Sequence, residues 1–332
     1  MTARRPTIVD VAAASGVSKS TVSNVVRGAA GVSADTRSRV LAAVESLGYR
    51  PNAAARNLVQ RRTNLIGVVV WDLANAFDAE LVKRLEQAAS AGGYTTVVCN
   101  TGGHPELEAS RIDALLEQRV DGIALVDFTG DRAVLSRLLA DRVPVVMVSC
   151  WADYADCVAV DDQAGIELAV RHLAELGHER IGYVDQPTME ATTRRARAEA
   201  FERALERRGL PVRWMFSEDD VAIAAGGPTA LVAATDHIAI GLIDRLEAAG
   251  VSIPGDVSLV GFDGIAIGAL ARIALTTVAQ PAGELAGQAV ALLRHRIDRG
   301  HAAAPEQRRL APRLVVRGST APPPQSRARR RT

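Results

Sequence analysis

The stretch TIVDVAAASGVSKSTVSNVVRG, residues 7–28, holds two short helical patterns separated by a tight turn. Thr7 can cap the first helix, with Asp10 at the third helical position as in a capping box, and Gly16 can end it. Ser18 can cap a second helix that continues to the end of the stretch. Because so few residues separate the two patterns, the stretch predicts a helix-turn-helix.

The second predicted helix has an apolar and a polar face. Its valines, Val22, Val25 and Val26, fall on one side and are expected to pack on the first helix. The polar side carries Lys19, Ser20, Ser23, Asn24 and Arg27. Lys can donate to guanine, Ser to several base edges, and Asn can pair with adenine, while short side chains let a helix lie deep in the major groove. The pattern favours a recognition helix, and a solvated helical hairpin is the alternative.

The charge distribution also favours a polyanionic partner. Residues 1–62 hold ten Lys/Arg against three Asp/Glu, whereas residues 63–307 hold 21 against 35. A basic module joined to an acidic body points to nucleic acid, and Thr7, Ser18 and Thr21 are placed for phosphate contacts. The proline-rich end, residues 321–332, carries basic and no acidic side chains, and we expect it to be a disordered tail.

A third helical pattern covers residues 33–47, and the periodicity changes at Leu65. From there short aliphatic runs alternate with amphipathic helical segments. The runs are LIGVVV, YTTVVC, DGIALVD, VPVVMVS, RIGYVD, TALVAAT and VSLVGF. Strand and helix repeated this often imply parallel sheets covered by helices, and a second series resuming at Arg180 predicts two doubly wound lobes. The predicted fold class is α/β, with a helix-turn-helix head and a two-lobed body that binds ligands at the carboxyl ends of its strands.

Several classes of protein are disfavoured. There is no run of 18 apolar residues and no basic-then-apolar leader, so we expect a cytoplasmic protein without a membrane partner. The three cysteines, Cys99, Cys150 and Cys157, are expected to be free thiols. Histidines lack metal spacing, with His172 and His178 expected to be structural, and no nucleophile elbow or phosphate loop occurs. We therefore expect no metal, no cofactor and no enzymatic activity.

Residues 7–28, followed by VSADTRSRVLAAVESLGYRPNAAARNLVQRRTNLIGVVV, closely resemble the DNA-binding head and hinge of the LacI/GalR (lactose-repressor) family of bacterial transcription regulators. The resemblance implies a DNA-binding domain over residues 1–50 and a hinge over 51–62 that becomes helical on specific DNA. Paired hinge helices of a dimer would enter the minor groove, with Leu58 as an apolar wedge and Ala55 and Asn52 beside it. A leucine can partly unstack a base step and kink the duplex.

The resemblance continues through residues 63–320, in VAVDDQAGIELAVRHLAELGHERIGYV, SIPGDVSLVGFDG and LTTVAQP among other segments. These look like the family's two-lobed effector and dimerisation domain, which is similar to periplasmic sugar-binding proteins and holds its ligand between the lobes. Carried over by position, the implied effector contacts are Asp72, Asn75, Phe77, Asp162, Arg197, Asp236 and Gln280. Carboxylates and an arginine suit vicinal hydroxyls, and an aromatic ring suits the apolar face of a sugar. Each residue alone also has a structural reading, such as a helix cap for Asp236 or an ion pair for Arg197.

The sequence departs from the family pattern at several positions. Trp71 replaces a proline and Asp78 an aromatic residue, while Thr235 stands for an asparagine and Ala279 for an arginine. An acidic group at position 78 would favour a polyol or a cationic ligand over an anionic one. The region 210–229 is about half the expected length, so we expect one helix of the second lobe to be missing or reduced, with consequences for the far wall of the pocket.

The resemblance implies a dimeric, sequence-specific repressor of a palindromic operator, released or less often recruited by a small molecule, most simply a carbohydrate. A transport protein that binds sugars would share the body, but the basic head and the missing export signal argue against it. An enzyme is the third possibility, and no catalytic set supports it. Because no leucine-heptad tail follows Thr320, we expect a homodimer and no tetramer.

Overall fold

The computed structural model describes residues 6–26, 28–49, 62–128, 131–186, 191–212, 214–221, 227–300 and 304–324. The chain divides into two compact units, residues 1–63 and 64–332. We call the first the head and the second the body, and each is considered by itself.

The head is a bundle of three short helices in its described residues, α1 (Ile8–Ser15), α2 (Lys19–Val26) and α3 (Ala34–Leu47). Its small core joins one or two side chains from each helix, chiefly Val11, Val22, Val25, Val40 and Ala43. Gly16 and Gly48 end α1 and α3 with φ near +60°, where a side chain would be strained. The predicted helix-turn-helix and its valine face are therefore confirmed.

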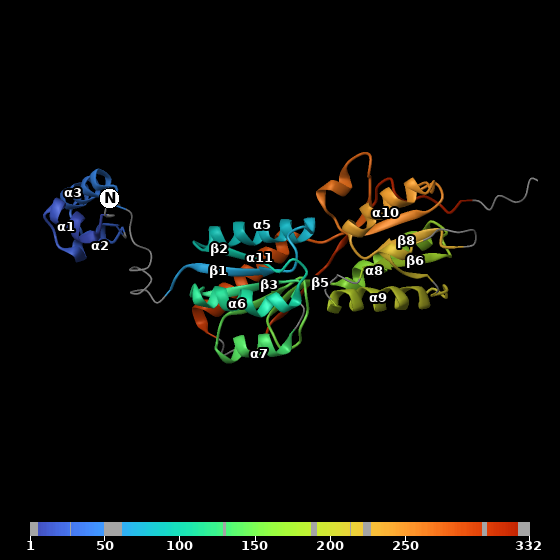
Figure 1. The fold of residues 1–332 in the computed structure, drawn as a ribbon, viewed down its shortest axis with the longest axis horizontal. Coiled ribbons are helices and arrows are strands. Elements are labelled where there is room, and N and C mark those ends of the chain that lie inside the picture. The colour runs from blue at the N-terminus through green and yellow to red at the C-terminus, as the bar shows by residue number, and fades with distance from the viewer. Residues whose placement is uncertain are drawn as a thin grey trace, which may run out of the picture. The chain divides into compact units, whose positions relative to one another are not determined.

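Lobe 1 of the body contains one parallel six-stranded sheet in the order β11-β5-β4-β3-β1-β2. Its strands are β1 (Leu65–Val70), β2 (Thr95–Asn100), β3 (Gly122–Val126), β4 (Val145–Val148), β5 (Cys157–Val160) and β11 (Gln307–Leu310). Helices α5 (Ala76–Ala91) and α11 (Ala282–Arg299) cover one face, and α6 (Glu108–Glu117), preceded by the 3-10 turn η1 (Pro105–Leu107), and α7 (Arg132–Ala140) cover the other (Figure 1). Aliphatic cores fill both interfaces.

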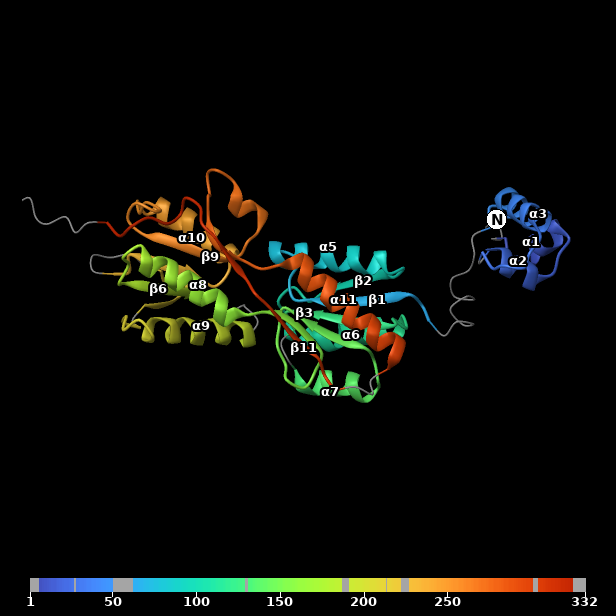
Figure 2. The same cartoon turned by 180° about the vertical axis from the view of Figure 1, so that it is seen from behind.

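Lobe 2 repeats this plan with the order β12-β10-β9-β8-β6-β7, in which β12 alone is antiparallel. The strands are β6 (Ile181–Asp185), β7 (Met215–Ser217), β8 (Ala230–Ala233), β9 (Ser258–Asp263), β10 (Thr276–Ala279) and β12 (Arg313–Val315). Helices α8 (Asp162–Glu175) and α9 (Ala191–Glu206) pack together on one face and α10 (Asp236–Ala248) lies on the other (Figure 2). Two doubly wound lobes were predicted, and both are present.

The described chain passes between the lobes at three points, after β5, after β10 and after β11. Each point follows the carboxyl end of a strand, so the carboxyl ends of both parallel sheets face the junction between the lobes. Open parallel sheets bind ligands at this edge. The topology therefore fixes where a ligand pocket can form.

The expected shortening of lobe 2 is confirmed in the connection between β7 and β8. Its described residues contain the 3-10 turn η2 (Glu218–Asp220) and no α-helix, whereas α6 bridges the equivalent strands of lobe 1. Phe216 packs against the lobe 2 core instead, and a Cβ added at Gly182 would lie 3.2 Å from its ring. Arg245 of α10 bonds to the Glu218 carbonyl and so holds the turn against the lobe.

The two histidines expected to be structural join the C-terminal segment to lobe 2. His178 is buried, with Nδ1 2.9 Å from Thr229 Oγ1 and Nε2 2.8 Å from the carbonyl oxygen of Ala321. His172 Nε2 lies 3.0 Å from Thr320 Oγ1. The folded chain thus continues beyond residue 320, where the basic tail was expected to begin. Residues 325–332 lie outside the described part.

The cysteines are free thiols, as expected, with Cys150 and Cys157 buried and Cys99 half-buried. Among the described side chains, no group of His, Cys, Asp or Glu is arranged to hold a metal ion. No helix in the described ranges has the length and apolar character that crossing a membrane requires.

Candidate functional site

The first candidate surface is the start of α2 in the head. Ser18, Lys19 and Ser20 are exposed there, while Thr21, Ser23 and Asn24 are half-buried. The buried Val22 and Val25 hold the helix against the core, so the polar side chains lie on its outer side. Of the other predicted DNA contacts, Arg27, Asn52, Ala55 and Leu58 lie outside the described residues.

Hydroxyl groups cluster at the N-terminus of α2. Ser18 Oγ accepts from the backbone N–H of Thr21 at 3.1 Å, and lies 2.7 Å from Ser20 Oγ and 2.8 Å from Thr21 Oγ1. Ser18 therefore caps α2, as predicted. Thr7 lies at the start of α1, where its backbone N–H and its hydroxyl each donate to Asp10 Oδ2 at 2.7 Å. Helix N-termini with such donors suit phosphate oxygens.

The second candidate site is a cavity of about 440 Å³ between the two lobes of the body. This volume lies in the range of small-molecule sites. Nearly all of its lining residues follow the carboxyl ends of strands, as the topology requires: Trp71, Asp72, Ala74, Asn75, Phe77, Gly102, Gly103, His104, Asp127, Ser149, Gln186, Thr235, His237, Asp263 and Gln280, joined by Thr193 and Arg197 from α9.

Five of the seven predicted effector contacts line this cavity: Asp72, Asn75, Phe77, Arg197 and Gln280. Asn75 also caps α5, accepting from the backbone N–H of Phe77 at 3.0 Å. Asp72 Oδ1 accepts from the backbone N–H of Ala74 at 3.0 Å, which shapes the loop after β1. The structure brings these residues together from both lobes, although it does not place Asp162 or Asp236 in the lining.

Arg197 is buried at the lobe 2 wall, and Asp162 serves to hold it there. The Nε atom of Arg197 donates to Asp162 Oδ1 at 2.8 Å. The Nη1 atom of Arg197 donates to the Ala234 carbonyl at 2.6 Å and lies 3.9 Å from Asp263 Oδ1. The guanidinium also lies over the Phe262 ring, 3.8 Å from its centre. Packing and hydrogen bonds thus orient Arg197 before any ligand arrives.

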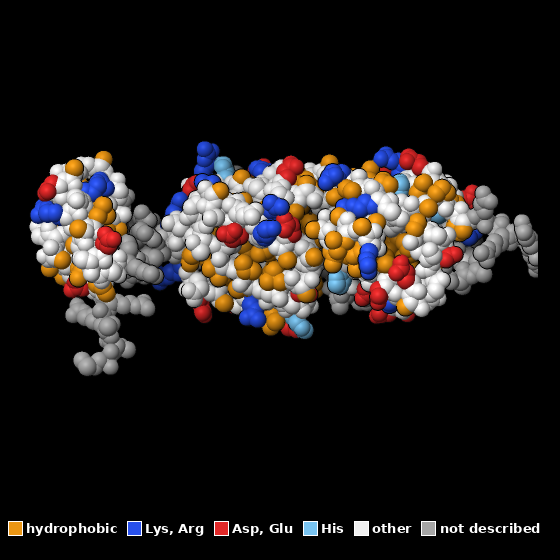
Figure 3. All heavy atoms as spheres, turned by 90° about the horizontal axis from the view of Figure 1, so that it is seen from above, with side chains coloured by type: hydrophobic (Ala, Val, Ile, Leu, Met, Phe, Trp, Pro, Cys, Tyr) orange, Lys and Arg blue, Asp and Glu red, His pale blue; other side chains and the backbone are white. Residues whose placement is uncertain are grey.

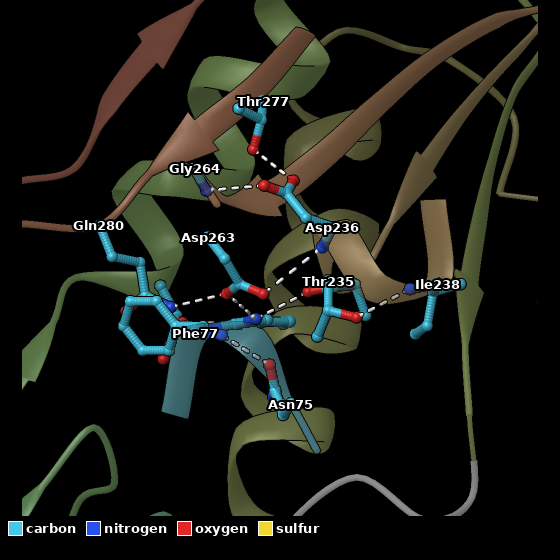
Figure 4. Close-up of polar contacts among 12 residues, drawn as sticks. Asn75, Phe77, Thr235, Asp236, Ile238, Asp263, Gly264, Thr277 and Gln280 are labelled. Carbon is cyan, nitrogen blue, oxygen red and sulfur yellow. Dashed lines mark hydrogen bonds and ion pairs between the residues drawn. The ribbon is translucent and has the colours of Figure 1, made fainter. Parts of the chain in front are cut away.

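Asp236, a predicted effector contact, is turned away from the cavity in the structure. Its side chain is fully buried and turns toward the lobe 2 backbone, where Oδ2 accepts from the N–H group of Gly264 at 2.8 Å (Figure 4). The same oxygen accepts from the N–H group of Ile265 at 2.9 Å. Oδ1 accepts from Thr277 Oγ1 at 2.5 Å. The helix-cap alternative is also incorrect, because Thr235 caps α10 by accepting from the Ile238 N–H.

Asp263 is the pocket carboxylate that the sequence reasoning missed. It ends β9 with a backbone φ of 134°, a region that side chains other than glycine rarely adopt, and its carboxylate lines the cavity. Oδ1 accepts from Gln280 Nε2 at 2.8 Å (Figure 4). Burial raises the pKa of Asp263 well above its usual value, and Arg197 opposes the shift. Its position directly after an aliphatic run was the signal that could have identified it.

Comparisons with known proteins match both the head and the body. The family model described as "Bacterial regulatory proteins, lacI family" matches residues 7–52, and the model of a periplasmic binding protein-like domain matches residues 170–320. The HTH-type transcriptional regulator DegA of Bacillus subtilis (strain 168) is 33% identical, and the alignment covers 96% of this chain and 99% of that one. The chain belongs to the lacI family.

Solved structures support the same conclusion. A lac repressor dimer bound to operator and the anti-inducer ONPF has a TM-score of 0.84 and 26% identity, covering 96% of this chain and 100% of that one. A LacI family regulator from Enterococcus faecium with bound ribose has a TM-score of 0.68 and 30% identity, covering 78% and 99%. This lacI-family protein is thus a DNA-binding transcriptional regulator and not an enzyme.

One departure from the family pattern has a different effect from the one expected. Asp78, which replaces an aromatic residue, does not line the cavity; it is fully buried behind Asp127, which does. Burial, together with the negative charge of nearby Asp127, raises the pKa of Asp78 well above its usual value. In this lacI-family protein the carboxyl group of Asp78 therefore influences the pocket through its charge interaction with Asp127, which lines it.

Proposed function

We propose that this protein is a transcriptional repressor that binds a palindromic operator as a homodimer and leaves it when a small sugar occupies the body. The observation that carries the proposal is the head: a helix-turn-helix whose second helix exposes Lys19 and Ser20 at its N-terminus, within the family match. Recognition helices read base edges from this end. A regulator of DNA acts where the DNA is, so we also propose the cytoplasm as its location.

We assign the head residues by the kind of contact each side chain can make. Lys19, Ser20 and Asn24 would read bases, with Ser23 and Arg27 beside them on the same side of the helix. Thr7, Ser18 and Thr21 would bind phosphates and position the head. The hinge residues Asn52, Ala55 and Leu58 would bend the operator from the minor groove.

The effector proposal rests on the cavity and on the relative with bound ribose. Asp72, Asn75, Arg197 and Gln280 would hold hydroxyl groups, with Asp263 added to the predicted set. Phe77 would pack on the apolar face of a sugar ring. Asp162 would act by orienting Arg197, to which it is bonded.

A dimer is supported by apolar side chains that the described part of the body leaves exposed, among them Leu73, Val98, Ile267 and Leu270. Figure 3 shows apolar side chains gathered in patches on the face that carries α5 and α10. Exposed patches of this kind mark sites of association. Two identical heads related by two-fold symmetry would require an operator with two inverted half-sites.

The test is selection of binding sites from random DNA with the full chain, followed by binding measurements on the selected sequence. We expect inverted half-sites, and an affinity that falls steeply with salt. Lys19→Ala and Asn24→Ala should each relax the preference at one position per half-site, costing about 1–3 kcal/mol there. Ser38→Ala, on the exposed side of α3, is the matched control. Selection of no common sequence, or an unchanged preference in both variants, would contradict the proposal.

A further inference from the structure

Three residues at the end of β9, Asp263–Ile265, extend from the pocket into the other lobe, and we call them the β9 loop. Asp263 lines the cavity, whereas Ile265 is buried, at 9% exposure. Ile265 packs in the aliphatic cluster of lobe 1 that contains Phe77 and Leu285. Within the described chain it is the one fully enclosed side chain that lobe 2 contributes to this cluster. The β9 loop therefore joins a carboxylate that faces the ligand site to the core of lobe 1.

Asp236 holds the β9 loop from behind the cavity wall. Its Oδ2 accepts from the N–H of Gly264 at 2.8 Å, and its Oδ1 accepts from the Thr277 hydroxyl at 2.5 Å (Figure 4). Oδ2 also accepts from the N–H of Ile265 at 2.9 Å. A Cβ added at Gly264 would lie 2.6 Å from the Ala279 Cβ, so the loop lies tightly against β10. Because breaking buried hydrogen bonds is costly, Asp236 fixes the path of the loop.

The first residue of the loop is tied to one of the crossings between the lobes. Gln280 begins the crossing after β10, and its backbone N–H donates to the Asp263 carbonyl at 3.0 Å. Its side-chain amide donates to Asp263 Oδ1 at 2.8 Å. The backbone φ of Asp263 is 134°, a conformation that persists only when the surroundings enforce it. A ligand that contacts Asp263 or Gln280 therefore acts on the loop and on the crossing at once.

The helix that begins at Asp236 makes a second contact with lobe 1. Ile240, one turn into α10, packs against the aliphatic clusters of both lobes. Ile240 and Ile265 thus both reach lobe 1 from backbone that Asp236 holds in place. Tightly packed apolar contacts change between discrete arrangements and do not deform continuously. A displacement of the β9 loop would therefore change how the two lobes pack.

We propose that the β9 loop couples ligand binding in the pocket to the arrangement of the lobes, with Asp236 and Ile265 as positioning residues. Asp263 contacts the ligand, Asp236 keeps the loop rigid, and Ile265 carries its displacement into the core of lobe 1. A ligand shifts an equilibrium between two arrangements only through contacts that differ between them, and the loop supplies such contacts at both of its ends. This inference rests on the proposed function, because it concerns the response of that regulator to its effector.

The test measures two quantities on the full chain. One is its affinity for the selected operator without sugar, and the other is the sugar concentration that releases half of the bound operator. The sugars are D-ribose, D-glucose, D-galactose and the corresponding alditols. Ile265→Ala should shift each quantity about two- to thirtyfold, as expected for variants that modify coupling between sites, and Ile265→Val should shift each less. The shifts should be linked, because weaker operator binding implies release at a lower sugar concentration, and the reverse.

Ile181 supplies the matched control. It begins β6, at the end of the lobe 2 sheet opposite the pocket, and is buried in the core of lobe 2. Ile181→Ala and Ile181→Val remove the same atoms as the Ile265 variants, and they should change neither quantity. Thermal unfolding confirms that each variant is folded. Where an alanine variant does not fold, the two valine variants give the comparison.

A third variant tests the role of Asp236. Asp236→Asn should make the amides of Gly264 and Ile265 exchange faster with solvent, because the carboxylate that holds both is lost. It should also reduce, by about two- to thirtyfold, the factor by which saturating sugar weakens operator binding. That factor is a ratio measured on folded molecules, so a loss of stability alone does not change it. Native values of both the exchange rates and the factor would overturn the positioning role of Asp236.

The outcomes separate the inference from the proposed function. Linked shifts in the Ile265 variants that are absent from the Ile181 variants support the inference. Native values in Ile265→Ala, or equal changes in Ile181→Ala, overturn it and leave a sugar-controlled regulator standing. If no sugar releases the operator, the sugar effector is overturned and operator affinity alone decides the inference. A change confined to Ile265→Ala then supports it, and no change overturns it.

Discussion

Asp236 and Asp263 show that neighbouring carboxylates at the ends of two adjacent strands can have unrelated roles. Asp236 follows β8 and Asp263 ends β9, and both lie near the pocket edge of lobe 2. Asp236 accepts backbone and hydroxyl donors and is closed off from the cavity, whereas Asp263 lines it. Gly261 makes the difference possible, because a Cβ there would lie 2.2 Å from Asp236 Oδ1.

The first prediction concerns Asp236. Asp236→Ala should lower the free energy of unfolding by about 2–4 kcal/mol, because the N–H groups of Gly264 and Ile265 would lose their buried acceptor. Asp236→Asn should cost less, since the amide keeps an acceptor oxygen. Urea unfolding measures both variants, with Asp113→Ala on the surface as the control. Unchanged stability of the Ala variant with a lost ligand response would instead indicate direct ligand contact.

At the scale of the element, helix caps and helix-ending glycines in the sequence predicted where the helices of the head begin and end. The second prediction is that Ser18→Ala weakens α2 by about 1 kcal/mol, the usual loss for a serine N-cap. Hydrogen exchange of the α2 amides should then be roughly fivefold faster, if local opening governs it. Ser38→Ala, inside α3, should leave exchange in α2 unchanged. Equal exchange rates in Ser18→Ala and the native chain would contradict the cap.

The third prediction concerns the segment beyond α8. Burial lowers the pKa of His178, which faces Thr229, Ser258, the Ala321 carbonyl and, at longer range, His172. A lowered pKa in the folded state means that folding favours the neutral imidazole. The stability that neutral His178 contributes is therefore complete above its unfolded pKa of about 6.5, and it is lost as the pH falls through the lower folded pKa.

We therefore expect the midpoint temperature of thermal unfolding to decrease as the pH is lowered below about 6.5. Amides near Ser319 and Ala321 should exchange first. His178→Gln should reduce this acid sensitivity. His104→Gln, at an exposed position, should leave it unchanged. Acid sensitivity that persists in His178→Gln would assign it to other groups, including His172, whose pKa burial also lowers.

At the scale of the whole molecule, a buried ion pair joins segments far apart in sequence. Arg296, near the end of α11, donates to both oxygens of Asp156 at 2.7 and 2.8 Å, and Asp156 also accepts from the Glu306 N–H. Arg296 donates as well to the Ala304 carbonyl. These contacts tie the end of α11 and the segment that enters β11 to the start of β5, so they stabilise the edge of the lobe 1 sheet.

The fourth prediction follows from this pair. Arg296→Leu should cost about 3–5 kcal/mol, because it leaves Asp156 buried without its cation. The double variant Asp156→Asn with Arg296→Leu should recover part of the loss, since the buried charge is removed. Denaturant unfolding of both variants, with Arg137→Leu as the surface control, measures the difference. A double variant no more stable than Arg296→Leu alone would contradict an electrostatic origin.

The sequence predicted the features that are set by contacts within a few residues. Helix caps, helix-ending glycines and the long aliphatic runs marked the head and the central strands correctly, because hydrophobic period and cap chemistry are local. The predicted runs did not include the short strands β5, β7, β10, β11 and β12. QRRL and RLV, for example, become strands only by pairing with partners far along the chain. The reduced connection between β7 and β8, whose described residues contain no α-helix, was predicted from its length compared with the family pattern.

The sequence by itself thus determined a helix-turn-helix head, two parallel lobes and a pocket at the carboxyl ends of their strands. Only the tertiary structure decided which side chains face that pocket: it put Asp236 behind the wall, brought Asp263 into it through an unusual backbone angle, and set Asp78 behind Asp127. The reason is physical. A side chain at the end of a strand points where its backbone torsions and its neighbours from other strands allow, and those neighbours come from both lobes.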